Sequence, residues 1–206
     1  MSEALITKRA LASSLKKLME RRSLSKLTVG DIVEECSVTR KTFYNHFRDK
    51  YELLNWIYQT ESAKSISGFD LFDQWTTCLD RLFANFYENR AFYVHALNDS
   101  DSTSFERCLF EVTHKLVLSN VLGHIDELAA HPVSAEQCAF IADFYAFAFV
   151  GIATRWIREG MKEPPATLTA NMCHIVDGTI GYALENWAPS GSSLPARLAG
   201  EGRARQ

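Results

Sequence analysis

Apolar residues recur at helical spacing along most of the chain. Near the N-terminus Leu11, Leu15 and Leu18 fall at steps of four and three, which is typical of an amphipathic helix. No stretch shows strict apolar and polar alternation bounded by hairpin turn residues. The pattern therefore predicts an all-α protein of about nine helices, over residues 5–22, 28–36, about seven residues from 39, 49–63, 69–90, 91–97, 105–128, 135–159 and 168–187.

Two of the predicted helices are short and lie close together. Thr28 and Asp31 fit a capping box at the start of the first, and Thr39 offers an N-cap hydroxyl for the second. Only Ser37-Val38 separates them, which leaves room for a tight turn. This arrangement predicts a helix-turn-helix. Phe43 and Phe47 form the inner face of its second helix, and the outer face presents Thr39, Arg40, Lys41, Thr42, Tyr44, Asn45 and His46.

Charge is divided unevenly along the chain. Residues 1–50 carry a net charge of +5, whereas residues 51–206 carry −8, within a total of −3. A local excess of cations is what neutralises phosphates, so only the N-terminal part is expected to meet a polyanion. A solvated, charged helix face is the alternative explanation for the basic segment.

Other functional classes find little support in the sequence. The five cysteines form no C-x-x-C pair and are interpreted as reduced, mostly buried thiols. The histidines show no metal-ligand spacing, and no phosphate loop or nucleophile–base pattern is present, so neither an enzyme nor a cofactor is predicted. Without an apolar run long enough for a membrane span or signal peptide, the chain is expected to be cytoplasmic.

The N-terminal motif resembles the TetR/AcrR family of transcription regulators. The resemblance covers roughly residues 8–60 and rests on residues 27–33 (LTVGDIV), 37–40 (SVTR), 42–47 (TFYNHF) and 50–54 (KYELL). It implies that Arg40, Lys41, Thr42 and Asn45 face bases or adjacent phosphates, with Thr39 in the same interface, and that the DNA backbone is held by Thr28, Tyr44, His46 and Lys50. Tyr44 and Lys50 are implied as the leading phosphate contacts.

Two residues depart from the family pattern. Ser37 stands where the turn usually has glycine, so it must adopt an unusual backbone angle or shift the turn. Gly30 lies inside the first short helix. Glycine destabilises a helix, but the effect is reduced here because Gly30 falls in the first turn.

The C-terminal part resembles a TetR-like subgroup related to dihydroxyacetone-kinase regulators, on residues 143–152 and 155–161. Small residues alternate with aromatic ones here, at Ala146, Ala148, Gly151 and Ala153. A partner helix could approach such a surface closely, which predicts a four-helix dimer interface with residues 168–187, including Gly178 and Gly181. An ordinary buried core helix explains the same pattern.

Aromatic residues are dense across the C-terminal part and could line an apolar ligand cavity, although a plain core would have the same composition. They are Phe69, Phe72, Trp75, Phe83, Phe86, Phe92, Phe105, Phe110, Phe140 and Phe144. No ligand-binding residue is assigned from the sequence.

The expected organisation is a DNA-binding domain over residues 1–64, an effector and dimerisation domain over 65–188, and a disordered tail over 189–206. The expected function is that of a homodimeric repressor, released from its double-stranded operator by an unknown effector. A regulator controlled by a protein partner, or one acting as an activator, is the alternative.

Overall fold

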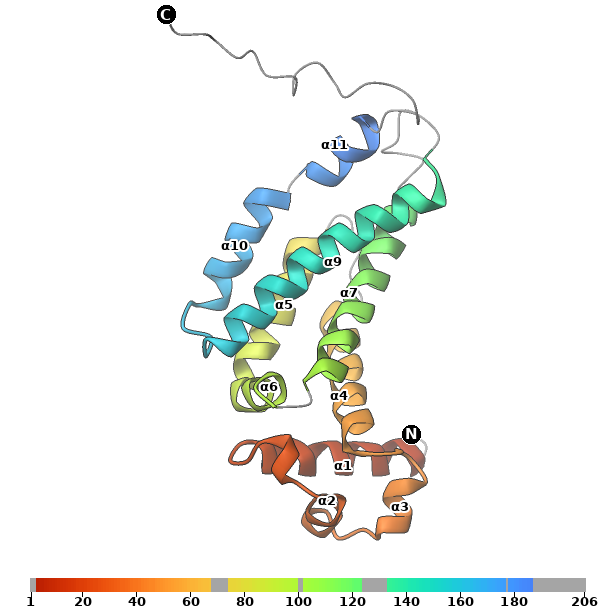
Figure 1. Ribbon diagram of the computed structural model, residues 1–206, viewed down its shortest axis with the longest axis vertical. Coiled ribbons are helices and arrows are strands. Elements are labelled where there is room, and N and C mark those ends of the chain that lie inside the picture. The colour runs from red at the N-terminus through yellow and green to blue at the C-terminus, as the bar shows by residue number, and fades with distance from the viewer. Residues whose placement is uncertain (1–2, 68–73, 100–101, 124–132, 177, 187–206) are drawn as a thin grey trace, which may run out of the picture.

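The computed structural model describes residues 3–67, 74–99, 102–123, 133–176 and 178–186 (Figure 1). Regular structure in these ranges is entirely helical, which confirms the all-α prediction. The elements are α1 Glu3–Met19, η1 Leu24–Lys26, α2 Val29–Glu35, α3 Arg40–Tyr44, α4 Lys50–Ile66, α5 Trp75–Glu88, α6 Arg90–Leu97, α7 Thr103–Gly123, α9 Ala135–Arg158, α10 Pro165–Val176 and α11 Thr179–Asn186.

The first three helices form a small unit at one end of an elongated molecule (Figure 1). Helix α1 lies across α2 and α3, and the start of α4 packs on α1. Leu15, Ile32, Phe43 and Leu53, one from each helix, are completely buried. Hydrophobic burial between four short segments therefore holds this unit together.

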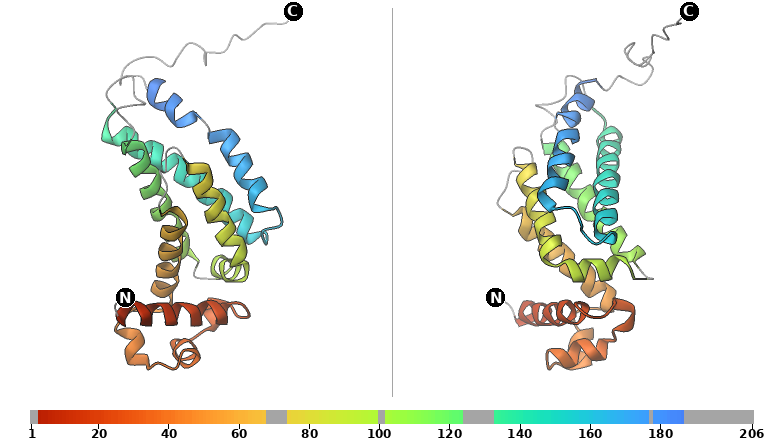
Figure 2. Two further views of the ribbon diagram at one scale, coloured as in Figure 1. Left: turned by 180° about the vertical axis from the view of Figure 1, so that it is seen from behind. Right: turned by 90° about the vertical axis from the view of Figure 1, so that its left-hand side faces the viewer.

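Helix α4 runs from that unit into a second bundle made of α5, α6, α7, α9, α10 and α11 (Figure 2). Helix α7 packs along α9, and α10 packs along α5. Tyr58 of α4 stacks on Phe86 of α5 with ring centroids 6.1 Å apart, and Phe86 meets Tyr93 of α6 edge to face at 4.7 Å. These buried rings join α4 to the C-terminal bundle.

Several helix boundaries differ from the prediction. Helix α1 ends at Met19 rather than at residue 22, and α4 continues to Ile66 rather than ending at residue 63. The stretch 168–187, predicted as one helix, is divided into α10 and α11 near Gly178, whose φ of +73° interrupts helical geometry. Phe69, Phe72 and the tail 189–206 lie outside the described residues.

Helix α9 is long and apolar enough to cross a membrane by length and composition, with a mean hydropathy of 1.5 over its most apolar window. It nevertheless packs on α7, and 39% of that window is buried inside the protein. Its inner residues Ala142, Ala146 and Ile157 are completely covered. We interpret α9 as a core helix with one exposed face.

Candidate nucleic-acid interface

Helix α3 is held at a fixed angle by two aromatic anchors. Phe43 is completely buried and Phe47 is 3% exposed, and Phe47 meets Trp56 of α4 with ring centroids 5.8 Å apart. At the start of α3 the Thr39 hydroxyl accepts a hydrogen bond from the Thr42 backbone N–H at 3.1 Å, as the sequence predicted. The helix has five residues rather than about seven, and the chain continues through Asn45 and His46 as a tight turn.

The outer face of α3 carries the predicted DNA-contacting side chains. Arg40, Lys41 and Asn45 are exposed, and Tyr44 is 58% exposed although it is aromatic. Thr42 and His46 are half-buried, and the Thr42 hydroxyl lies 2.8 Å from that of Thr39. The structure thus brings these residues together on one surface at the end of the molecule.

The turn between α2 and α3 depends on an unusual backbone angle at Ser37. Its φ is +56°, in the left-handed region that favours glycine. The Ser37 N–H donates to the Glu34 carbonyl at 3.1 Å and the Val38 N–H donates to the Val33 carbonyl at 3.0 Å. Of the two alternatives expected from the sequence, Ser37 therefore adopts the strained angle.

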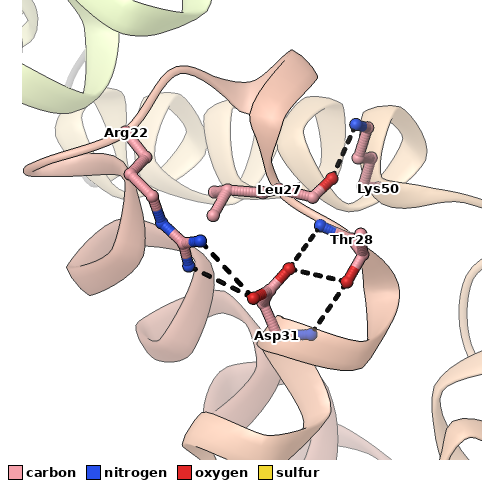
Figure 3. Close-up of polar contacts among 5 residues, drawn as sticks. All are labelled: Arg22, Leu27, Thr28, Asp31 and Lys50. Carbon is pink, nitrogen blue, oxygen red and sulfur yellow. Dashed lines mark hydrogen bonds and ion pairs between the residues drawn. The ribbon is translucent and has the colours of Figure 1, made fainter.

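The start of α2 is closed by a capping box (Figure 3). The Thr28 hydroxyl accepts from the Asp31 N–H at 3.1 Å and donates to the Asp31 carboxylate at 2.6 Å, while the Thr28 N–H donates to the same carboxylate at 2.7 Å. Arg22 adds an ion pair at 3.3 Å. The hydrogen bonds from Thr28, aided by Arg22, lower the pKa of Asp31 to about 2.

Lys50, at the start of α4, makes contacts within the chain (Figure 3). Its Nζ donates to the carbonyls of Leu24 and Leu27 at 2.8 Å each and to that of Ser25 at 3.3 Å. An ammonium group has three donors, so all of them are engaged. Lys50 therefore ties α4 to the segment that leads into α2.

Gly30 of α2 gives the Arg40 side chain room to approach. A Cβ atom at Gly30 would lie 2.7 Å from Nη2 of Arg40 and 3.2 Å from the Thr28 hydroxyl. The guanidinium of Arg40 consequently lies over the first turn of α2. Spacing along the sequence gave no reason to connect these two residues.

Two cations were not among the predicted site residues. Arg48 follows α3 and its side chain is 85% exposed, with an ion pair to Asp49 at 3.1 Å. Lys26 is exposed at the end of η1. Their charge and their closeness to the two short helices were visible in the sequence, and the structure adds that both side chains are exposed.

The small residues that predict a dimer interface on α9 lie on two different sides of the helix. Ala148 and Gly151 are exposed, whereas Ala146 and Ala153 are buried against the protein's own core. The exposed side also carries three phenylalanines that are 62–67% exposed: Phe140, Phe144 and Phe147. We call these five exposed residues of α9, from Phe140 to Gly151, its aromatic face. Ile175 of α10 and Tyr182 of α11 are likewise exposed.

The dense aromatic residues of the C-terminal part serve different purposes. Phe92 and Phe105 are ordinary core residues, and Phe140 and Phe144 are exposed. Three others, Trp75, Phe83 and Phe86, line a cavity of about 380 Å³ inside the bundle. Both of the expected uses of these residues are therefore present.

The chain matches known proteins over both of its parts. Residues 13–57 match the family model described as bacterial regulatory proteins, tetR family, and residues 73–178 match a transcriptional regulator C-terminal region. A relative from Lactococcus lactis, the HTH-type dhaKLM operon transcriptional activator DhaS, is 32% identical over 160 residues, which are 78% of this chain and 84% of the relative.

Solved structures of related regulators also match this chain. The dihydroxyacetone kinase operon activator DhaS superposes with a TM-score of 0.67 and 25% identity, covering 86% of this chain and 98% of the other. A tetR-family regulator from Streptomyces coelicolor shares the fold, with a TM-score of 0.58 and 16% identity over 89% of this chain and 88% of the other. All of these matches are regulators rather than enzymes. The chain belongs to the TetR family of transcription regulators.

Proposed function

We propose that this protein is a homodimeric regulator that binds double-stranded operator DNA with α3 in the major groove. The observation that carries the proposal is the outer face of α3, where Arg40, Lys41, Tyr44 and Asn45 are exposed on a helix anchored by buried Phe43. An α-helix fits the major groove, and guanidinium, ammonium and amide groups pair there with base edges and phosphates.

The predicted DNA-contacting residues of α3 and of the positions next to it fall into two groups. Arg40, Lys41, Thr42 and Asn45 contact bases or the phosphates next to them. With α3 in the major groove, Thr39, Tyr44 and His46 would border the groove wall, so we assign them to the DNA backbone. Arg40 and Lys41 suit these roles because neither makes an ion pair within the described part of the chain.

Thr28 and Lys50 lie at the helix starts on either side of α3, where the family resemblance implies phosphate contacts. Their polar groups are already engaged, Thr28 with Asp31 and Lys50 with three carbonyls. We propose that both act mainly by positioning α2 and α4. A direct phosphate contact from Lys50 requires it to release one carbonyl.

The homodimer is proposed to form through the aromatic face of α9, together with α10 and α11. Exposed phenylalanines on a soluble protein are costly unless a partner covers them. In a two-fold dimer the small residues Ala148 and Gly151 allow the two copies of α9 to approach closely. Two α3 helices could then reach half-sites one helical turn of DNA apart.

The proposed direction of regulation is repression, relieved when an effector shifts the dimer away from the half-site spacing. Activation is the second candidate, and it is favoured by the relative that is named an operon activator. Transcription in vitro from the promoter upstream of the protein's own gene, with and without the protein, decides between them. Because we propose that it binds operator DNA, we place the protein in the cytoplasm.

Binding to DNA from upstream of its gene, measured over a range of salt concentrations, tests the DNA-binding role. We expect Lys41→Ala to weaken binding and to reduce the slope of log K against log salt by about 1, as the loss of one phosphate charge predicts. Tyr44→Phe should weaken binding without changing the slope, because only a neutral hydroxyl is lost.

Lys115→Ala provides the control, since Lys115 is exposed on α7 in the distant bundle. It should bind like the wild type. If the protein prefers its upstream DNA no more than random DNA, or if Lys41→Ala and Tyr44→Phe bind like Lys115→Ala, the assignment of α3 is wrong.

A further inference from the structure

The C-terminal bundle contains a partly open cavity of about 380 Å³, a volume within the range of small-molecule sites. Helices α4, α5, α7 and α9 form its walls, and residues of α10 and α11 close one side. Phe149, Val150 and Ala153 line it from α9. The aromatic face of the same helix points elsewhere, so the cavity and the proposed dimer interface use different sides of α9.

Among the described residues that line this cavity, none has a charged side chain. These residues are aliphatic and aromatic, and their polar groups are the hydroxyls of Tyr58 and Thr113, the Cys78 thiol, the Asn120 amide and the Trp75 indole N–H. Burial raises the pKa of Tyr58 to about 12 and also raises the pKa of Cys78, so both are neutral at physiological pH. An anion or cation entering here would lose its hydration without gaining a counter-charge.

The polar groups are also poorly suited to a polyol. The Thr113 hydroxyl donates its hydrogen to the Leu109 carbonyl at 2.8 Å, so it can offer a ligand only a lone pair. A small polyol needs several donors and acceptors to replace the water it leaves, and the polar groups of the described lining are few beside its apolar surface. Aromatic surface from Trp75, Phe83 and Phe86 instead favours a flat apolar molecule.

We propose that the cavity binds one uncharged, mainly apolar and ring-containing molecule, and that this molecule is the effector. The inference rests on the proposed regulatory function and adds the chemical class of the ligand. Tyr58 gives the site a connection to the DNA-binding unit, because it belongs to α4, the helix that begins at Lys50. A ligand that displaces Tyr58 or the Phe86 ring stacked on it therefore acts on α4 directly.

Two fluorescent probes that share one ring system test the chemical class. N-phenyl-1-naphthylamine is uncharged, and 8-anilinonaphthalene-1-sulfonate carries the same rings with a sulfonate. Titrated into the full chain, the uncharged probe should bind at one molecule per chain and at least tenfold more tightly than the sulfonate. Excess dihydroxyacetone should not displace it, whereas naphthalene should. Equal or tighter binding of the sulfonate, or displacement by dihydroxyacetone, would overturn the proposal.

Variants locate the bound probe. Ala153→Leu on α9 and Val117→Phe on α7 each add side-chain volume to the cavity, so each should weaken binding of the uncharged probe at least tenfold. Two sites are used so that one variant remains if the other fails to fold, which circular dichroism detects. Leu122→Ser, at a 50% exposed apolar position on α7 outside the cavity lining and outside the aromatic face of α9, should bind the probe within twofold of the wild type. Loss of binding in Leu122→Ser with unchanged binding in both cavity variants would place the probe on the exposed surface and contradict the proposal.

Operator binding at saturating uncharged probe completes the test. A change in operator affinity of threefold or more supports the effector role, and unchanged affinity overturns it. The outcomes separate the two proposals: a chain that binds its operator but not the probe retains the proposed function without this inference. A chain that binds the probe but shows no operator preference retains the cavity assignment and loses the proposed function.

Discussion

At the scale of single residues, three side chains of the N-terminal unit bear on the position of α3. Ser37 makes the turn before it, Asp31 closes the helix that packs on it, and Lys50 fixes the segment leading to that helix. Each acts through backbone geometry rather than through its own exposed surface. Their substitutions should therefore change stability more clearly than they change any single DNA contact.

Ser37→Gly should stabilise the protein. A non-glycine residue at a φ of +56° pays a steric cost, and removing its Cβ should raise the free energy of unfolding by about 1 kcal/mol. Urea denaturation measures the change. Ser37→Ala, which keeps the Cβ, is the matched control and should show no such gain; an equal gain in both variants would mean that the backbone angle is not the cause.

Asp31 should make stability depend on acid pH. Its folded pKa of about 2 lies below the ordinary value of 3.8, so the stabilisation is complete above the unfolded value and is lost as the pH falls through the folded value. We expect Asp31→Asn to cost about 1 kcal/mol at pH 6, typical of a weakened N-cap. The difference from wild type in urea denaturation should shrink between pH 5 and pH 3. If the difference in stability between the two proteins does not change with pH, the lowered pKa of Asp31 is contradicted.

Lys50→Met should destabilise the fold by about 2 kcal/mol, because the Leu27 carbonyl loses its ammonium donor and the Leu24 carbonyl keeps only the Leu27 N–H. Lys41→Met is the control, since Lys41 is exposed on α3 and its change should stay within about 0.5 kcal/mol. Thermal and urea denaturation of both variants check this. If Lys50→Met is as stable as Lys41→Met, the positioning role is wrong and Lys50 is free for a phosphate.

At the scale of helices, α1, α4, α5 and α6 are joined by polar contacts around Glu61. Lys16 of α1 donates to the Glu61 carboxylate, and the buried Tyr93 hydroxyl lies 3.0 Å from Glu61 and 3.2 Å from Asn85 of α5. Burial and the neighbouring Glu61 carboxylate raise the pKa of Tyr93 well above its ordinary value, so it remains a donor. The contacts link a helix of the DNA-binding unit to a helix that lines the cavity.

Glu61→Gln should weaken this connection. Its amide can still accept from Tyr93, but the charge opposite Lys16 is lost, and we expect a destabilisation of about 2 kcal/mol. Glu35→Gln is the matched control, because the Lys17–Glu35 pair is more exposed and should contribute less than about 0.5 kcal/mol. A double-mutant cycle with Lys16→Met measures the coupling energy between Lys16 and Glu61. A coupling energy no larger than that between Lys17 and Glu35 would contradict the role of Glu61 in joining these helices.

At the scale of the whole molecule, the arrangement separates three surfaces. The end carrying α3 has the proposed DNA-binding surface, the cavity lies in the bundle, and the aromatic face of α9 is exposed. Helix α4 runs from the unit that contains α3 into the bundle (Figure 2), where its residue Tyr58 lines the cavity. In the proposed mechanism the dimer face sets the distance between the two α3 helices. A ligand in the cavity regulates DNA binding by acting on α4 and so changing that distance.

Phe144→Glu should convert the protein to a monomer. A carboxylate in the centre of an apolar interface is buried without a partner, so we expect the dimer dissociation constant to rise at least tenfold. Light scattering across a concentration series measures it. Ile6→Glu, at a 56% exposed position on α1, should leave the dimer intact. A wild type that is monomeric at every concentration, or a dimer that Phe144→Glu does not affect, would contradict the proposed interface.

The spacing of residues along the sequence by itself determined much of this protein's secondary structure. Helical periodicity, the caps at Thr28 and Thr39, and the two phenylalanines of α3 specify a helix-turn-helix, because each depends on residues within a turn or two of one another. The same spacing identified the outer face of α3. The basic charge of the first 50 residues and the family motifs pointed to DNA without any knowledge of the fold.

Only the tertiary structure decided the partners of Lys50, the approach of Arg40 to Gly30, and the division of α9 into an inner and an outer face. Ala146 and Ala148 look alike in the sequence, yet one is completely buried and the other exposed. The cavity likewise combines residues as distant as Tyr58 and Gly181. Such features arise from packing between segments far apart in the chain, and local periodicity carries no information about which segments meet.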